Sequence, residues 1–243
     1  SKFLKRVQVI TEKVTTVTKE KIHTEKEEYK FDYLVLSSGS NTPNPMFDNT
    51  YLLKTVEDAK LLYSKILTAK SVVIIGGGLT GTEIAGELCT KTDKKILLIH
   101  SLQRIMERQP EKASKASFMF LHGNAVSIVL NTRALEIKDG VLHISNNETI
   151  EADCYIWCTG ISPNSNPLTG FPLNEKGYVT IEPTLNVTGL GHVFAGGDIT
   201  DLKEEKCAQN AEYHGKIIAE NIIRGIKGKK LIQYVLAKRV MVI

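Results

Sequence analysis

The six residues Gly76-Gly77-Gly78-Leu79-Thr80-Gly81 follow the glycine pattern Gly-x-Gly-x-x-Gly. In this pattern Gly76 permits a tight turn, Gly78 lets the backbone approach a diphosphate, and Gly81 lets a helix pack closely on a strand. The N–H groups at the start of that helix favour negative charge, because the positive end of the helix dipole lies there. The pattern therefore predicts a dinucleotide-binding turn. A glycine turn that binds nothing is the alternative.

The segments on either side of this turn have the order that such a site needs. Residues 71–75 are a continuous apolar run, typical of a strand buried on both faces. Residues 82–88 have the amphipathic spacing of a helix, and residues 95–99 form a second apolar run. A strand, a glycine turn, a helix and a strand within about 30 residues indicate a βαβ unit.

The end of the second strand bears on the choice of coenzyme. A carboxylate there usually binds the adenosine ribose of NAD. In this chain His100 or Ser101 stands at that position, and Arg104 follows. A carboxylate at this position would repel the 2′-phosphate of NADPH, and this chain has none there. Arg104 could bind that phosphate. These residues therefore favour NADPH or the use of both coenzymes. An Arg104 that only faces solvent is the alternative.

Three further turns follow short apolar strands. Residues 194–198 read Phe-Ala-Gly-Gly-Asp, and the carboxylate of Asp198 is suited to accept hydrogen bonds from the hydroxyls of a polyol or ribose. An ordinary turn with Asp198 as a cap is the alternative. Residues 36–40 and 157–161 share another pattern, in which a strand ends in small residues and a glycine.

The remaining pattern predicts an α/β chain. Residues 7–34 alternate in strand fashion from Val7 and Val9 onward, and residues 41–45 are a predicted loop. Periodicity predicts helices over 55–68, 111–125 and 206–224. Shorter strands are predicted over 33–36, 127–130, 135–137, 141–144, 155–157, 178–181, 192–195 and 240–243.

Composition limits the function classes. The chain has 243 residues, of which 42% are hydrophobic and 24% charged, as in ordinary globular proteins. A net charge of +4 is too small to indicate nucleic-acid binding. The four cysteines and six histidines show no metal-binding spacing, and the cysteine usage leads us to expect a cytoplasmic protein. Lys227, Lys229 and Lys230 predict a solvated basic face, with peripheral association with a membrane as the alternative.

Five motifs in one order carry a family resemblance. They are Ser-Ser-Gly at 37–39, the glycine turn, Cys-Thr-Gly at 158–160, Ala-Gly-Gly-Asp at 195–198 and the helical segment 208–215. Together they cover nearly the whole chain and resemble the FAD-dependent pyridine nucleotide–disulfide oxidoreductase superfamily. Ile-His-Ser at 99–101 and residues 156–160 resemble its apoptosis-inducing-factor-like branch, which includes the ferroptosis-suppressor type of NAD(P)H:quinone oxidoreductase.

The resemblance implies an α/β fold with two Rossmann-like, three-layer dinucleotide-binding domains. Residues 49–148 would bind NAD(P)H. Residues 1–48 and 149–228 would form a discontinuous flavin domain, and residues 229–243 would begin a C-terminal domain. The family has two glycine fingerprints and this chain has one. We therefore expect an incomplete flavin domain without the N-terminal FAD fingerprint, and a chain that corresponds to the central two-thirds of such an enzyme.

The resemblance also implies roles for single residues. Glu83 matches a catalytic acidic position near the nicotinamide and flavin, and a first-turn acid favoured by the helix dipole is the alternative. Asp198 would bind the ribityl and diphosphate region of FAD, and the helix start near Cys207 would point at the flavin pyrimidine ring. Two glycine turns, at 38–39 and 159–160, would be the crossings between domains. The expected cofactor-binding residues are Gly76, Gly77, Gly78, Leu79, Thr80, Gly81, Ser101, Arg104, Ser38, Gly39, Thr159, Gly160, Gly197, Asp198, Cys207 and Ala208.

The implied activity is transfer of hydride from NAD(P)H to FAD and of electrons to a quinone-like acceptor. A second hypothesis is a fragment or module that binds NAD(P)H without flavin turnover, which the single fingerprint supports. A third, an effector acting on nucleic acid, would need a strong basic patch. Cys154 and Cys158 are four residues apart, a spacing that we interpret as core packing and not redox chemistry.

Overall fold

The computed structural model describes residues 6–43, 47 and 49–236. The chain forms two compact units. Among the described residues, the central unit is Asn41–Ile161, and the terminal unit combines the segment up to Ser40 with the segment from Ser162 to Leu236. These boundaries lie at 40/41 and 161/162, where the sequence suggested 48/49 and 148/149. The coenzyme that each unit binds stays a prediction.

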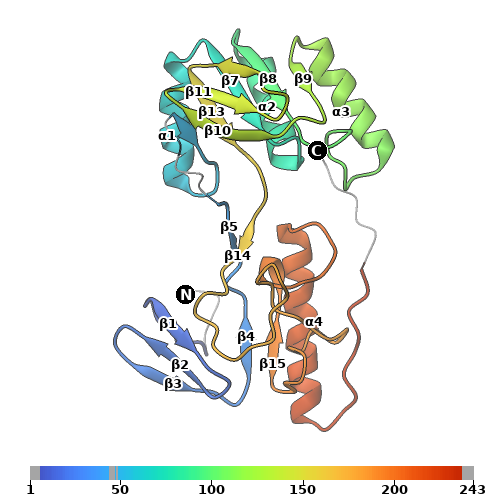
Figure 1. Cartoon of the computed structure of the whole chain (residues 1–243). Helices are drawn as coiled ribbons and strands as arrows, with labels where there is room; N and C mark the ends of the chain where they lie inside the picture. Colours follow the sequence, from blue (N-terminus) through green and yellow to red (C-terminus); the bar gives the residue numbers. More distant parts are fainter. Residues whose placement is uncertain (1–5, 44–46, 48, 237–243) are drawn as a thin grey trace. The chain divides into compact units, whose positions relative to one another are not determined.

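The central unit is built on a five-stranded parallel sheet (Figure 1). Its strands lie in the order β6 (Thr50–Tyr51), β13 (Cys154–Trp157), β7 (Ser71–Ile75), β8 (Lys95–Ile99) and β9 (Ser127–Val129). Three helices connect them: α1 (Val56–Thr68), α2 (Leu79–Lys91) and α3 (Glu111–Gly123). The predicted α/β class and the βαβ unit around the glycine turn are confirmed.

Three layers enclose two hydrophobic cores in this unit. Alternate residues of β7 point to opposite faces of the sheet, so Ile74 packs against the helices and Ile75 against the other side. The helical layer contributes Leu62, Ala85 and Leu121 to the first core. The third layer is an antiparallel meander of β10 (Ala134–Lys138), β11 (Val141–Ile144) and β12 (Thr149–Glu151). This covered parallel sheet is the Rossmann-like arrangement predicted from the sequence.

The terminal unit is organised around two parallel strands and one long helix (Figure 1). Strand β4 (Leu34–Leu36) pairs with β15 (Val193–Ala195), and α4 (Ala208–Ile226) packs Ile217 and Ile218 against Phe194. A short 3-10 helix, η1 (Gly197–Ile199), follows β15 directly. The short strands β5 (Ser40–Asn41) and β14 (Ser162–Pro163) also pair with each other.

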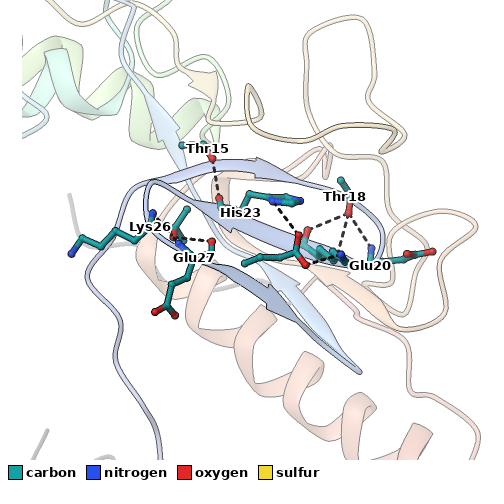
Figure 2. Close-up of polar contacts among 9 residues, drawn as sticks. Thr15, Thr18, Glu20, His23, Lys26 and Glu27 are labelled. Carbon is teal, nitrogen blue, oxygen red and sulfur yellow. Dashed lines mark hydrogen bonds and ion pairs between the residues drawn. The ribbon is translucent and has the colours of Figure 1, made fainter.

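A second antiparallel meander belongs to the terminal unit and consists of β1 (Val14–Val17), β2 (Lys21–Thr24) and β3 (Glu28–Lys30). Figure 2 shows how threonine side chains fix its turns. The Thr18 hydroxyl accepts hydrogen bonds from the N–H groups of Glu20 and Lys21. Thr24 does the same for the next turn. Such side-chain bonds stabilise tight turns without a glycine.

Two expected strands were wrong. Val7 and Val9 precede β1, are 55% and 66% exposed, and belong to no strand among the described residues. Residues 178–181 form only isolated bridges, such as Val179 with Leu173 and with Thr200. The chain there turns too often at positive-φ glycines to extend a ladder. Asn41, expected in a loop, belongs to β5. Residues 44–45 of that loop and the predicted strand 240–243 lie outside the described residues. Among the described residues, no helix has the length and apolar character needed to cross a bilayer.

Candidate functional site

The turn between β7 and α2 is tightly packed at three glycines and open at a fourth. Gly76 has φ +112°, and a Cβ there would lie 2.7 Å from the Cys158 carbonyl oxygen. A Cβ at Gly81 would lie 1.9 Å from the Gly76 carbonyl oxygen. A Cβ at Gly78 would meet nothing within 4 Å. A Cβ at Gly77 would lie 2.9 Å from Ile105 Cγ2, so Gly76, Gly77 and Gly81 are packed against protein atoms, whereas Gly78 borders open space.

The start of α2 is suited to an anion. Gly78 is the N-cap and offers no side-chain hydrogen bond, and the first turn contains no acidic residue. The first N–H groups of a helix have no partners within the helix, so they and the helix dipole favour a negatively charged ligand. Leu79 and Thr80 supply the first two helical positions. The residues present thus fit the diphosphate of a dinucleotide.

Glu83 lies one turn further along α2 and is exposed. It is in the same unit as the glycine turn. Its predicted role toward nicotinamide and flavin stays a prediction.

His100 has a structural role that the sequence did not reveal. The residue directly follows β8 and is only 7% exposed. Its Nδ1 accepts a hydrogen bond from the Gly77 N–H at 3.1 Å, and its Nε2 lies 3.1 Å from Glu107 Oε2. A ring whose Nδ1 accepts must carry its proton on Nε2, so His100 donates toward Glu107. The Gly77 N–H therefore has its hydrogen-bond partner within the protein, and the His100 ring stabilises the turn through this bond.

The segment after His100 places the predicted coenzyme residues differently. Ser101 is exposed. The Arg104 guanidinium donates hydrogen bonds to the backbone carbonyls of Met106, Glu107 and Gln109, the first at 3.2 Å and the last at 3.0 Å. Arg104 therefore stabilises its own loop. A phosphate at this side chain would compete with three carbonyl acceptors.

In the terminal unit, Asp198 is held by a residue far away in the sequence. The Ser40 hydroxyl donates to Asp198 Oδ2 at 2.7 Å, which fixes the carboxylate in η1. Gly197 precedes it with φ +76°, a conformation that favours glycine. A carboxylate oriented in this way still has acceptor capacity for ligand hydroxyls. The arrangement fits the polyol part of a flavin nucleotide.

The start of α4 resembles the start of α2 in its chemistry. Cys207 is the N-cap without a side-chain hydrogen bond, and no acidic residue lies in the first turn, which begins at the exposed Ala208. This helix end can therefore stabilise negative charge on a ligand. The Asp198 turn and this helix end belong to the same unit.

The two predicted crossings are glycine turns. Gly39 and Gly160 have φ +68° and +62°. Ser38 is tied to Asn164 by two bonds: its hydroxyl donates to the Asn164 carbonyl at 2.9 Å, and the Asn164 amide donates to the Ser38 carbonyl at 2.8 Å. Thr159 is half-buried beside the Gly76 turn. A proline and an asparagine follow both turns in the sequence, but the bonds of Asn164 to Ser38 were not predicted.

Three of the four cysteines, Cys89, Cys154 and Cys158, lack the environment of a redox centre. Burial raises the pKa of both Cys154 and Cys158 to about 12, so both thiols are protonated at neutral pH. Burial also raises the pKa of Cys89. Reactive cysteines need the thiolate form, so these thiols act as small apolar side chains.

Comparisons with known proteins agree with this architecture. The chain is 32% identical over 231 residues to apoptosis-inducing factor homolog A of Dictyostelium discoideum, covering 81% of this chain and 56% of that protein. It is 29% identical over 227 residues to ferroptosis suppressor protein 1 of Taeniopygia guttata, covering 86% of this chain and 60% of the relative. The chain thus spans between half and two-thirds of the length of these curated relatives.

Among solved structures, the ferredoxin reductase for the CYP199A2 system of Rhodopseudomonas palustris superposes with a TM-score of 0.82. The likeness covers 96% of this chain and 62% of that one at 19% identity, and it concerns the fold. Residues 1–215 match the family described as pyridine nucleotide-disulphide oxidoreductase. The match extends over most of the chain, including both glycine-rich turns described above. The chain therefore belongs to the pyridine nucleotide-disulphide oxidoreductase family, which uses FAD and NAD(P)H.

Proposed function

We propose that the protein containing this chain is an FAD-dependent oxidoreductase that takes hydride from NAD(P)H and passes electrons to a quinone-type acceptor. The observation that carries the proposal is the turn at 76–81, where Gly78 borders open space and Gly81 packs on backbone. A turn of this shape at an uncapped helix start suits a dinucleotide diphosphate. FAD, when bound, supplies the redox chemistry itself.

The chain's own residues would bind and orient the two cofactors. Gly78 and the first turn of α2 would hold the NAD(P)H diphosphate, and Glu83 would orient the nicotinamide end. Asp198, fixed by Ser40, would accept hydrogen bonds from the ribityl hydroxyls. The start of α4 at Ala208 would stabilise negative charge on the reduced flavin.

The proposal of a quinone-type electron acceptor rests on the resemblance to known proteins. The branch motifs Ile-His-Ser at 99–101 and the similarity to a ferroptosis suppressor protein support a quinone. The buried, protonated thiols of Cys154 and Cys158 support an acceptor other than a protein disulfide, since neither can serve as a thiolate relay.

The coenzyme is tested at Arg104. If its guanidinium meets a 2′-phosphate, Arg104→Ala weakens NADPH binding and leaves NADH binding unchanged. If it serves only the loop through its three carbonyl bonds, the same change weakens both coenzymes equally. Isothermal titration with each coenzyme separates the two results.

A module that binds NAD(P)H without flavin turnover is the second candidate, and the turn at 76–81, which by itself suits one dinucleotide, favours it. The decisive experiment is the absorption spectrum of the purified protein, recorded alone, with FAD and then with NADPH. A flavin band that bleaches with NADPH and recovers on adding a soluble quinone supports the oxidoreductase. Coenzyme binding without a flavin band supports the module.

Glu83→Gln then tests the catalytic assignment. We expect flavin reduction to slow while the dissociation constant for NADPH stays within about twofold, because the diphosphate grip lies at Gly78. Glu87→Gln is the matched control, since Glu87 is an exposed glutamate on the same helix, in an ion pair with Lys91. Equal rates for both variants would remove Glu83 from the mechanism.

A further inference from the structure

A buried histidine joins the Gly197–Asp198 turn to the chain that follows α4. His214 lies on α4 and is 1% exposed. Its Nδ1 accepts a hydrogen bond from the Gly197 N–H at 2.9 Å, and its Nε2 lies 2.8 Å from Glu204 Oε1. Because Nδ1 is an acceptor, the ring proton is on Nε2, the nitrogen that lies beside the Glu204 carboxylate.

The network continues into residues 229–236, here called the post-helix segment, which returns alongside α4 (Figure 1). The Tyr234 hydroxyl donates to Glu204 Oε2 at 2.6 Å, and its ring meets the His214 ring edge to face at 4.7 Å. The Tyr234 N–H donates to the Pro183 carbonyl at 2.8 Å. The Glu204 side chain is 4% exposed. A continuous set of polar contacts, centred on the buried His214 and Glu204 side chains, thus runs from Gly197 to Tyr234.

Such a network is sensitive to the loss of any member. A buried polar group without a partner is costly, so the partners hold each other in place. The helix also presses on the turn, since a Cβ at Gly196 would lie 3.1 Å from His214 Cβ. The Gly196–Gly197 turn, with its positive φ at Gly197, thus contacts His214 by packing and by a hydrogen bond.

The central unit repeats the arrangement. There His100 accepts from Gly77, the second glycine after a parallel strand, and faces Glu107. In both units a histidine supports the second glycine of a glycine turn and directs its other nitrogen to a glutamate. The His100 set ends at Glu107 in its own loop, whereas the His214 set reaches a separate segment through Tyr234.

We propose that His214 is a positioning residue that couples docking of the post-helix segment to the shape of the Gly197–Asp198 turn, and thereby to flavin affinity. The flavin part rests on the proposed function, and the coupling between the two segments does not. Coupling is reciprocal: docking of Tyr234 would raise the affinity for FAD, and FAD would protect the post-helix segment.

The test is a double-mutant cycle of Tyr234→Phe and His214→Asn. Asparagine places an amide oxygen near the position of Nδ1, so it keeps an acceptor for Gly197 and loses the contact with Glu204. His214→Gln does the opposite, because its longer side chain reaches toward Glu204. Lys216→Ala is the control, since it removes an exposed ion pair from the same helix.

The first readout is amide hydrogen exchange without flavin, followed in peptides that cover the turn 196–199 and the segment 229–236. We expect His214→Asn to release only the segment and His214→Gln to release only the turn. Tyr234→Phe should loosen the turn in the wild-type background and not in His214→Asn. Faster exchange in both the turn and the post-helix segment in each His214 variant would overturn the coupling. Exchange rates equal to those of the wild type in all variants would also overturn it.

The second readout is the FAD dissociation constant from flavin fluorescence. We expect about a tenfold increase in His214→Gln, the effect of one buried donor left without its acceptor. Tyr234→Phe should raise the FAD dissociation constant about fivefold in the wild-type background and leave it unchanged in the His214→Asn background. Equal, additive effects would overturn the proposal. If the wild-type protein binds no FAD, the proposed function fails, and hydrogen exchange alone decides the coupling.

Discussion

Gly81→Ala should destabilise the central unit strongly, because Gly81 touches backbone on which the glycine turn depends. The new Cβ would lie 1.9 Å from the Gly76 carbonyl oxygen and 3.3 Å from Ile74 Cγ2. Real Cβ contacts shorter than 3.0 Å essentially never occur, so α2 would have to move by about 1.1 Å. The Gly76 N–H is bonded to the Ile99 carbonyl at 2.8 Å, which resists a shift of the turn.

The expected cost is at the upper end of the range for overpacking, about 3 kcal/mol. For a chain of this size that lowers the melting temperature by roughly 6–12 °C. Thermal unfolding followed by far-ultraviolet circular dichroism measures it. NADPH titration on the same samples shows whether the distorted turn still binds.

Two glycines in the same region serve as controls. Gly86 lies inside α2, and a Cβ there would have its nearest neighbour at 3.9 Å, so Gly86→Ala should leave stability unchanged or raise it by up to about 1 kcal/mol. Gly78→Ala should cost at most about 1 kcal/mol, since the site is an open N-cap with φ −72°. It should nevertheless weaken NADPH binding, because the methyl group would stand where the diphosphate approaches. A Gly81→Ala protein as stable as Gly86→Ala would refute the packing argument.

Three further predictions concern stability and pH. Thr55→Ala should cost about 1 kcal/mol in urea unfolding, because Thr55 is the N-cap of a complete capping box on α1, and Thr55→Ser should restore most of it. Hydrogen bonds from the backbone and from the Ser71 hydroxyl lower the pKa of Asp153. Its contribution to stability is therefore present above the ordinary carboxyl pKa and is lost as pH falls through the lowered value. Asp153→Asn should flatten this acid dependence of stability in urea titrations. Burial raises the pKa of Cys154 and Cys158 to about 12, so both thiols should resist iodoacetamide at neutral pH until the protein unfolds, which mass spectrometry would detect. The same raised pKa values should make the stability of the protein fall as pH rises from about 9 toward 12.

The sequence by itself determined the βαβ unit and its glycine turn. Strands 71–75 and 95–99 have the bounds that the apolar runs predicted, and the helix after residue 55 begins at its capping threonine. These elements depend on residues within about 30 positions of each other. Periodicity, caps and glycines act locally, so a pattern along the chain is sufficient to predict them.

Only the tertiary structure decided which side chains support the turns. The sequence placed His100 or Ser101 where a ribose-binding acid would stand, and the structure shows that the His100 ring instead accepts from Gly77 and lies beside Glu107. Arg104, predicted to be available for a phosphate, is engaged by three carbonyls of its own loop. His214 meets Tyr234 only because the chain returns alongside α4 after residue 228. The path of a loop decides which polar groups meet, and that path depends on packing of the whole unit and not on the spacing of residues along the chain.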